Sequence, residues 1–147
     1  MEELNKSMRE CLANTFAMYF KAHSFHWNVE GINFPSYHEF FGNLYNELHG
    51  AIDPIAEEIR ALDYYAPAGL NELYASAKIA DSNIKGDSVK EMLGALLADN
   101  EQVLSCLNES FKLADAADLQ GLADFIAGRI DVHKKHGWML RASMRGA

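Results

Sequence analysis

The feature that most constrains the fold is the run of residues 35–62, in which apolar side chains recur at intervals of three and four residues. The members of this apolar line are Phe41, Leu44, Leu48, Ile52, Ile55, Ile59 and Leu62. At about 3.6 residues per turn, this spacing places them on one face of an α-helix. The run therefore predicts a long helix that buries this face against other helices.

A second line of residues follows the same run, and each member lies about one position beyond an apolar residue. The members of this polar line are His38, Gly42, Tyr45, His49, Asp53 and Glu57. One position corresponds to a rotation of about 100° around the helix axis. We therefore expect the polar line to face away from the core of its own subunit.

The length of the run decides whether the polar line can form a metal site within one chain. At a rise of about 1.5 Å per residue, His38 lies roughly 22 Å along the helix from Asp53, too far for one ion to contact both. If two copies of the helix pack antiparallel about a twofold axis near residues 45–47, His38 of one copy comes level with Asp53 and Glu57 of the other. Two carboxylates beside imidazole rings suit iron, manganese or zinc. The pattern thus predicts a metal site shared between subunits.

The composition is that of a globular, all-α protein. The chain has 147 residues, of which 49% are hydrophobic, and it contains only three prolines and no long strand-like alternation. We expect residues 1–147 to form a single domain. The formal charge of −8 disfavours a general attraction to nucleic acid or anionic lipid. This acidity either serves solubility alone or concentrates cations around the protein.

Features of membrane and secreted proteins are missing from the sequence. No apolar run approaches the roughly 18 residues that span a bilayer, and the N-terminus lacks the basic and apolar regions of a signal peptide. Cys11 and Cys106 stand alone within helical patterns, which indicates reduced core thiols. We therefore expect a cytoplasmic protein without a membrane partner.

The pattern before the run predicts a first helix from about Glu3 to Trp27. One stripe of this helix is made of Leu4, Met8, Cys11, Thr15, Met18, Ala22 and Phe25. The neighbouring stripe ends in His23 and His26, which places both histidines at the edge of the core. We interpret His23 as structural and His26 as a candidate ligand. The break at residues 31–35 is short, so the first two helices should be antiparallel neighbours.

The second half of the chain predicts two more long helices after a long connection at residues 64–86. We expect a short helix at residues 70–75 within this connection, and such a crossover lets the third helix lie parallel to the second. The capping box at residues 88–91 opens the third helix, and a break at residues 115–118 separates it from the fourth. Pro54 predicts a kink in the second helix.

His133 and His136 have a spacing that suits one helix face, but their context argues against a metal site. No carboxylate lies three residues before any histidine, so the Glu-x-x-His pairs of di-iron bundles with a site inside each subunit are absent. The His-Glu-x-x-His pattern of zinc proteases is absent too. We expect a structural His133 and a solvated His136.

Several motifs together resemble one known family. They are His26-Trp27-Asn28-Val29-Glu30-Gly31, Asn33-Phe34, His38-Glu39, Asp53, Glu57 and the late segment His136-Gly137-Trp138-Met139-Leu140-Arg141-Ala142. This set resembles the ferroxidase signature and last helix of the Dps-type mini-ferritins, the DNA-binding proteins from starved cells. The resemblance implies a ferritin-like four-helix bundle with a short helix between its second and third helices, assembled as a hollow dodecamer. It also implies iron sites at twofold interfaces, where ferrous iron is oxidised by hydrogen peroxide or dioxygen and then stored as ferric mineral.

The resemblance also assigns roles to individual residues. His26 and His38 would bind iron from one subunit, and Asp53 and Glu57 from its partner. Trp27 resembles a family tryptophan thought to intercept oxidising equivalents, and a packing role explains it equally well.

Gly42 departs from the family pattern, because members normally carry a further acid at this position. Its absence leaves two alternatives: a working ferroxidase with altered metal binding, or a degenerate shell that binds metal or only assembles. His49 lies on the same line and is a further candidate ligand, whose imidazole would favour zinc. DNA binding, which many members achieve through a lysine-rich tail, is not expected here, since Arg141 and Arg145 form only a thin patch.

Overall fold

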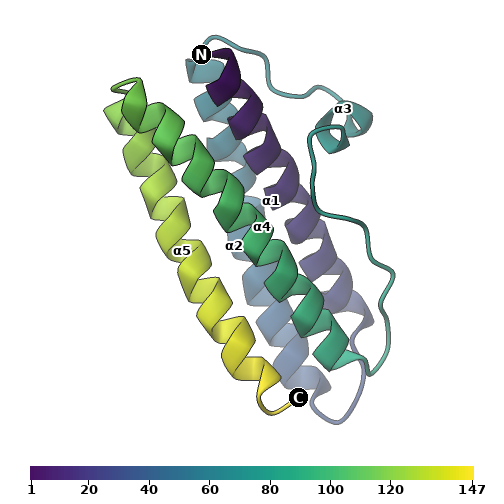
Figure 1. The fold of residues 1–147 in the computed structure, drawn as a ribbon. Coiled ribbons are helices and arrows are strands. Elements are labelled where there is room, and N and C mark those ends of the chain that lie inside the picture. Colours follow the sequence, from purple (N-terminus) through teal and green to yellow (C-terminus); the bar gives the residue numbers. More distant parts are fainter.

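The computed structural model describes all residues 1–147 and contains five helices. Their bounds are α1 Glu2–Asn28, α2 Phe34–Ala61, α3 Leu70–Tyr74, α4 Val89–Ala116 and α5 Gln120–Met144. The four long helices lie side by side as a bundle, and the short α3 stands beside α1 (Figure 1). The prediction of an all-α bundle with a short helix in a long connection is confirmed.

The directions of the helices also agree with the sequence pattern. α1 and α2 run antiparallel, and residues 62–88 then cross the length of the bundle, so that α4 runs parallel to α2 (Figure 1). The side chain of Arg9 on α1 anchors this connection, because it donates to the carbonyl of Tyr65 and forms an ion pair with Glu72 at 3.1 Å.

Glycines shape the connection between α1 and α2. Gly31 has a φ of 121°, which other residues rarely adopt, and Pro35 lies in the first turn of α2. The amide of Glu30 donates to the carbonyl of Gly86 at 2.9 Å, and the amide of Gly86 donates to Asn28 at 3.0 Å. This two-bond bridge fastens the turn that follows His26 to the end of the long connection.

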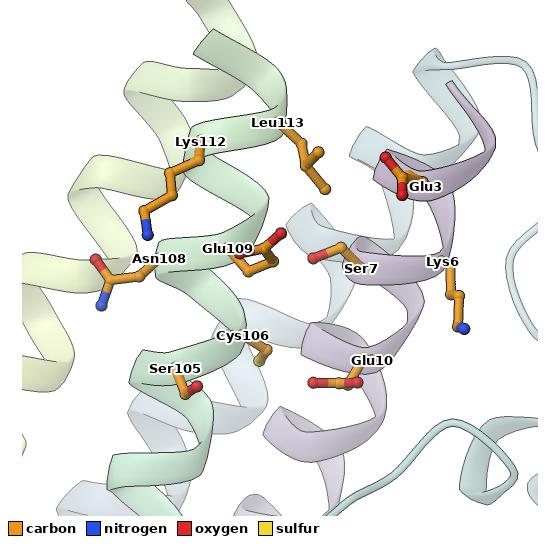
Figure 2. A pocket seen from close by; sticks show the side chains of 10 residues that line it. All are labelled: Glu3, Lys6, Ser7, Glu10, Ser105, Cys106, Asn108, Glu109, Lys112 and Leu113. Atoms are coloured by element: carbon orange, nitrogen blue, oxygen red, sulfur yellow. The ribbon is translucent and has the colours of Figure 1, made fainter. Parts of the chain in front are cut away.

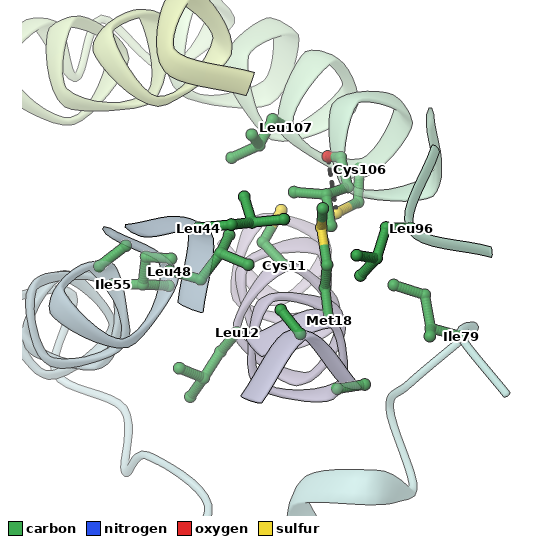
Figure 3. Packing of buried hydrophobic residues seen from close by; sticks show 14 of the residues in the cluster. Cys11, Leu12, Met18, Leu44, Leu48, Ile55, Ile79, Leu96, Cys106 and Leu107 are labelled. Carbon is green, nitrogen blue, oxygen red and sulfur yellow. Dashed lines mark hydrogen bonds between the residues drawn. The ribbon is translucent and has the colours of Figure 1, made fainter. Parts of the chain in front are cut away.

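The core consists of the apolar faces predicted from the sequence. All seven residues of the first-helix stripe are buried. On α2, the apolar line is buried at Phe41, Leu44, Leu48, Ile55 and Ile59 and partly buried at its other two positions. Side chains of α1, α2 and α4 interdigitate in this core, and Ile79 of the long connection joins them (Figure 3).

The two cysteines belong to this core, as predicted. Cys11 and Cys106 are both buried and unpaired. Burial raises the pKa of the Cys11 thiol, so the group stays protonated and unreactive.

One local prediction is only half right. Ser88 is the residue before α4, but its side chain makes no hydrogen bond to the helix, so the capping box does not form.

No helix combines the length and the apolar character that crossing a bilayer requires.

Candidate metal centre

His26 and His38 meet where α1 ends and α2 begins. The five-residue turn between the two helices folds the last turn of α1 against the first turns of α2. The two imidazole rings are stacked, with centroids 3.8 Å apart and planes 17° apart. The turn thus brings together the two histidines that the sequence singled out.

A reciprocal pair of hydrogen bonds holds these rings. His26 Nδ1 lies 2.6 Å from the carbonyl oxygen of His38, and His38 Nδ1 lies 2.7 Å from the carbonyl oxygen of His26. A carbonyl only accepts, so each Nδ1 carries the hydrogen and donates. In a neutral ring of this tautomer, Nε2 keeps a free lone pair, and neither Nε2 makes a hydrogen bond within the chain. Histidine ligands of metals are commonly oriented by such a bond through their other nitrogen, so this pair fits a transition-metal ion.

The neighbours of the two rings further restrict them. Phe34 stacks against His38 with centroids 5.0 Å apart, which leaves His38 between Phe34 and His26. The backbone of Gly42 lies against the His26 ring. Gly42 is therefore buried, and the expectation that this position faces away from the core is wrong.

Asp53 and Glu57 lie further along α2, and both are exposed. They are one helical turn apart, so their carboxylates share a face of the helix. The structure does not bring them to the histidines: no group of three or more His, Cys, Asp or Glu side chains in the chain is placed to hold a metal. Within one chain, the candidate ligands form an imidazole pair and a separate carboxylate pair.

An aromatic cluster adjoins the histidine pair. The centroid of the His23 ring lies 3.7 Å from that of Tyr45, with the two rings nearly parallel, and 4.2 Å from that of Trp27, a residue that is 57% exposed. The Tyr19 hydroxyl is hydrogen-bonded to His23 Nδ1 at 3.0 Å, and the centroid of the Tyr19 ring lies 5.0 Å from that of the exposed His49. Partial burial lowers the pKa of His23, and the nearby His26 and His49 lower it further.

This cluster agrees with a packing role for His23. Sequence reasoning gave no role to the contact between Tyr19 and His23, although the two residues are four positions apart on one helix face. That spacing is the signal that could have identified the pair.

A polar network links α2 to α5 near the middle of the bundle. Arg129 forms an ion pair with Glu47 and donates to the Nε2 atom of His133 at 3.0 Å. His136 Nε2 contacts the Glu47 carboxylate at 2.7 Å. His133 is fully buried and hydrogen-bonded to Asn100 at 2.8 Å, which agrees with the structural role expected of it. The prediction of a solvated His136 is wrong, because the carboxylate of Glu47 lies within its reach.

Electrostatics in this network favour a charged Glu47. Burial acts to raise the pKa of Glu47, but the hydrogen bonds from His136 and Arg129 and the guanidinium charge lower it to about 2. The network borders a cleft of about 450 Å³ between α2 and α5. Since the guanidinium of Arg129 already compensates the negative charge of Glu47, we interpret this network as structural.

A larger cleft of about 610 Å³ lies between α1 and α4. Its lining mixes acidic and basic side chains, among them Glu10, Glu109 and Lys112, with Cys106 at its floor (Figure 2). None of the predicted ligands lines it. The histidine pair is therefore separate from the larger clefts of the chain.

Comparisons with known proteins agree with this architecture. Residues 5–145 match the family model described as a ferritin-like domain. The four-helix fold and this match define a ferritin-like protein.

Its relatives narrow the class further. The chain is 35% identical to the DNA protection during starvation protein of Brevibacillus brevis, over 89% of this chain and 87% of that protein. It is 33% identical to DNA protection during starvation protein 2 of Bacillus anthracis, over 97% of this chain and 94% of that protein. A crystal structure of a Dps protein from Bacillus brevis superposes with a TM-score of 0.90 at 30% identity, covering 97% of this chain and 95% of that one. The chain belongs to the Dps-type mini-ferritins.

Proposed function

We propose that this protein is a ferroxidase that oxidises ferrous iron at sites shared between subunits and stores the ferric product. The observation that carries the proposal is the His26 and His38 pair, whose Nδ1 hydrogens are both engaged and whose Nε2 lone pairs are both free. The membership in a ferritin-like family supports iron as the substrate metal.

The sites lie at a twofold interface in this proposal. His26 and His38 of one subunit bind ferrous iron through Nε2, and Asp53 and Glu57 of the partner subunit complete the ligand set. The exposure of both carboxylates and their separation from the histidines support this arrangement. An antiparallel pairing of two α2 helices forms two such sites, one on each side of the axis.

The chemistry requires two electrons for each peroxide. Two ferrous ions give up one electron each, one hydrogen peroxide takes up both together with two protons, and two ferric ions and two waters result. Carboxylate oxygens from Asp53 and Glu57 stabilise the higher charge of the ferric product. Peroxide that is consumed in this way cannot form hydroxyl radicals with free iron.

Other parts of the proposal follow from the surface and the surroundings of the site. Trp27 is exposed and lies against His23, next to the histidine pair in the sequence, and would intercept stray oxidising equivalents. The assembled protein would be a hollow dodecamer in the cytoplasm, with dioxygen as a second oxidant and zinc or manganese as competing metals. With a formal charge of −8 per chain, DNA would bind weakly or not at all at physiological salt.

Anaerobic ferrous titration followed by stopped-flow mixing with peroxide tests the proposed function. We expect saturable binding to the metal-free assembly and ferric absorbance that rises much faster than in buffer. The variant with both Asp53→Ala and Glu57→Ala should retain its helical circular dichroism and lose at least tenfold of the oxidation rate, since both carboxylate ligands are gone. Full activity in that variant would refute the site assignment.

A second candidate function is a ferritin-like shell that binds metal or only assembles, without ferroxidase activity. Gly42 favours it, because no carboxylate stands where relatives carry one. Ferrous binding without accelerated oxidation in the same titration would establish this second function.

A further inference from the structure

Gly42 is an unusual residue for its place in the fold. It lies within the long helix α2, where a glycine is less favourable than alanine by roughly 1 kcal/mol. It is also buried, although it belongs to the polar line. A glycine at such a position calls for a packing reason.

The packing reason is the imidazole ring of His26. A Cβ atom added at Gly42 would lie 3.0 Å from both Cε1 and Nδ1 of this ring. Ordinary contacts between carbon atoms begin near 3.5 Å, so the ring would have to shift by a few tenths of an ångström for a side chain to fit. Gly128 on α5 offers a contrast, because a Cβ atom there meets nothing within 4 Å.

Any shift of the His26 ring acts directly on its contacts with His38. Its Nδ1 donates to the His38 carbonyl at 2.6 Å, and its face stacks on the His38 ring at 3.8 Å. In an α-helix the carbonyl of residue 38 also faces the amide of residue 42, which places Gly42 directly beside this hydrogen bond. A side chain at position 42 would therefore push the ring away from the carbonyl that orients it.

We propose that Gly42 is a positioning residue, which lets the His26 imidazole lie against the backbone of α2 so that His26 and His38 present their Nε2 atoms together. This inference rests on the proposed function for the part that concerns metal. An aspartate at position 42 would meet the His26 ring where it lies in this structure, so it would change the position of one ligand while it added another carboxylate.

Two variants and one matched control test the proposal. Gly42→Ala adds only a methyl group, Gly42→Asp restores the family carboxylate, and Gly128→Ala makes the same glycine-to-alanine change where space is open. Alanine and aspartate both favour helix over glycine, so all three variants should keep their helical circular dichroism. A crystal structure of metal-free Gly42→Ala reads the ring position directly. We expect the His26 ring to be turned away and its contact with the His38 carbonyl to be broken.

Anaerobic titration with Co²⁺, followed by its visible absorption, reads the consequence for metal. Groups that orient a metal-binding histidine typically contribute 10- to 100-fold in affinity, so we expect Gly42→Ala and Gly42→Asp to bind Co²⁺ at least tenfold more weakly than wild type. Gly128→Ala should bind as wild type does. Gly42→Asp should not bind more ions per subunit than wild type.

The outcomes separate this proposal from the proposed function. An unmoved His26 ring in Gly42→Ala, affinity within twofold of wild type, or an additional ion bound by Gly42→Asp would each overturn the role of Gly42. If the wild-type protein bound no Co²⁺, or if His38→Ala bound it equally well, the proposed metal site would fail, together with the metal part of this inference. The ring position in Gly42→Ala would still decide whether Gly42 positions His26.

Discussion

His133 makes the stability of the bundle dependent on pH. It is buried, and burial together with the positive charges of Arg129 and His136 lowers its pKa to about 3. In the unfolded chain a histidine has a pKa near ~6.5. Between these two values the unfolded chain binds a proton on His133 that the folded chain does not, so falling pH favours unfolding. The stabilisation that comes from keeping His133 uncharged in the fold is fully present above about pH 6.5 and is lost as the pH falls toward 3.

The measurement is the free energy of unfolding by urea at pH 7 and at pH 5, for wild type and His133→Gln. Between pH 7 and pH 5, the free energy of unfolding of wild type should fall by about 2 kcal/mol more than that of the variant. The contribution of Glu47 to the free energy of unfolding changes little between pH 7 and pH 5. Its stabilising charge is lost mainly below pH 4.5, as the pH falls toward its folded pKa of about 2. Equal losses in the two proteins would show that His133 takes up its proton over the same pH range in the folded and in the unfolded chain.

Lys21 and Asp99 form the other buried charged contact, between α1 and α4. Lys21 Nζ lies 2.8 Å from one carboxylate oxygen of Asp99, and both side chains are less than a tenth exposed. Burial raises the pKa of Asp99, and the hydrogen bond from Lys21 opposes that rise. Removing one partner leaves a buried group without its counter-charge, whereas replacing both by apolar residues is often neutral or stabilising.

We therefore predict that Lys21→Met alone lowers the free energy of unfolding by about 3 kcal/mol. The double variant Lys21→Met with Asp99→Leu should regain most of that loss. Urea denaturation of the two single variants and the double variant gives the coupling energy. Additive losses would show that the two residues act independently.

Among the elements, the bridge between residues 29 and 86 links the turn between α1 and α2 to the end of the long connection. Gly86 has a φ of 81°, in the left-handed region, and a Cβ atom there would meet only the Glu30 carboxylate at 3.6 Å. The penalty of a substitution therefore comes from the backbone. Gly86→Ala should lower the free energy of unfolding by about 1–2 kcal/mol, while Gly128→Ala should raise it by up to about 1 kcal/mol. Thermal unfolding of both variants checks the prediction. If the stability of Gly86→Ala equalled that of wild type, backbone strain at this position would be excluded.

The elements themselves could be predicted because burial repeats with the helix period. The apolar line of α2 and the first stripe of α1 were sufficient to place two helices and their buried faces. Periodicity gave no information on contacts that depend on one neighbour. Gly42 is buried by a ring from another helix, and Ser88 stands in the capping position without making the capping bond. His136 likewise meets Glu47 from a helix far away in sequence.

At the scale of the whole molecule, the sequence predicted how far apart the candidate ligands lie, but not how the histidines are held. The helical rise showed that His38 and Asp53 are too far apart to share an ion, and the fold keeps them apart. The reciprocal hydrogen bonds of His26 and His38 were not predictable, because they depend on how the turn at residues 29–33 aligns two backbones. That the site lies between subunits, and that residues 1–147 act as one domain, stay predictions.

Assemblies mixed from two inactive variants would test whether sites are shared. One variant carries His26→Ala with His38→Ala, and the other carries Asp53→Ala with Glu57→Ala. Each is expected to be inactive alone, but a pair with one subunit of each kind contains one site with all four ligands and one with none. Random one-to-one mixing, by co-expression or by dissociation and reassembly, should therefore restore about a quarter of the wild-type ferrous-binding sites and oxidation rate. Mixing the separately assembled variants without dissociation is the control and should restore nothing. If co-assembled subunits also restored nothing, each site would lie within one subunit, and the twofold arrangement would be wrong.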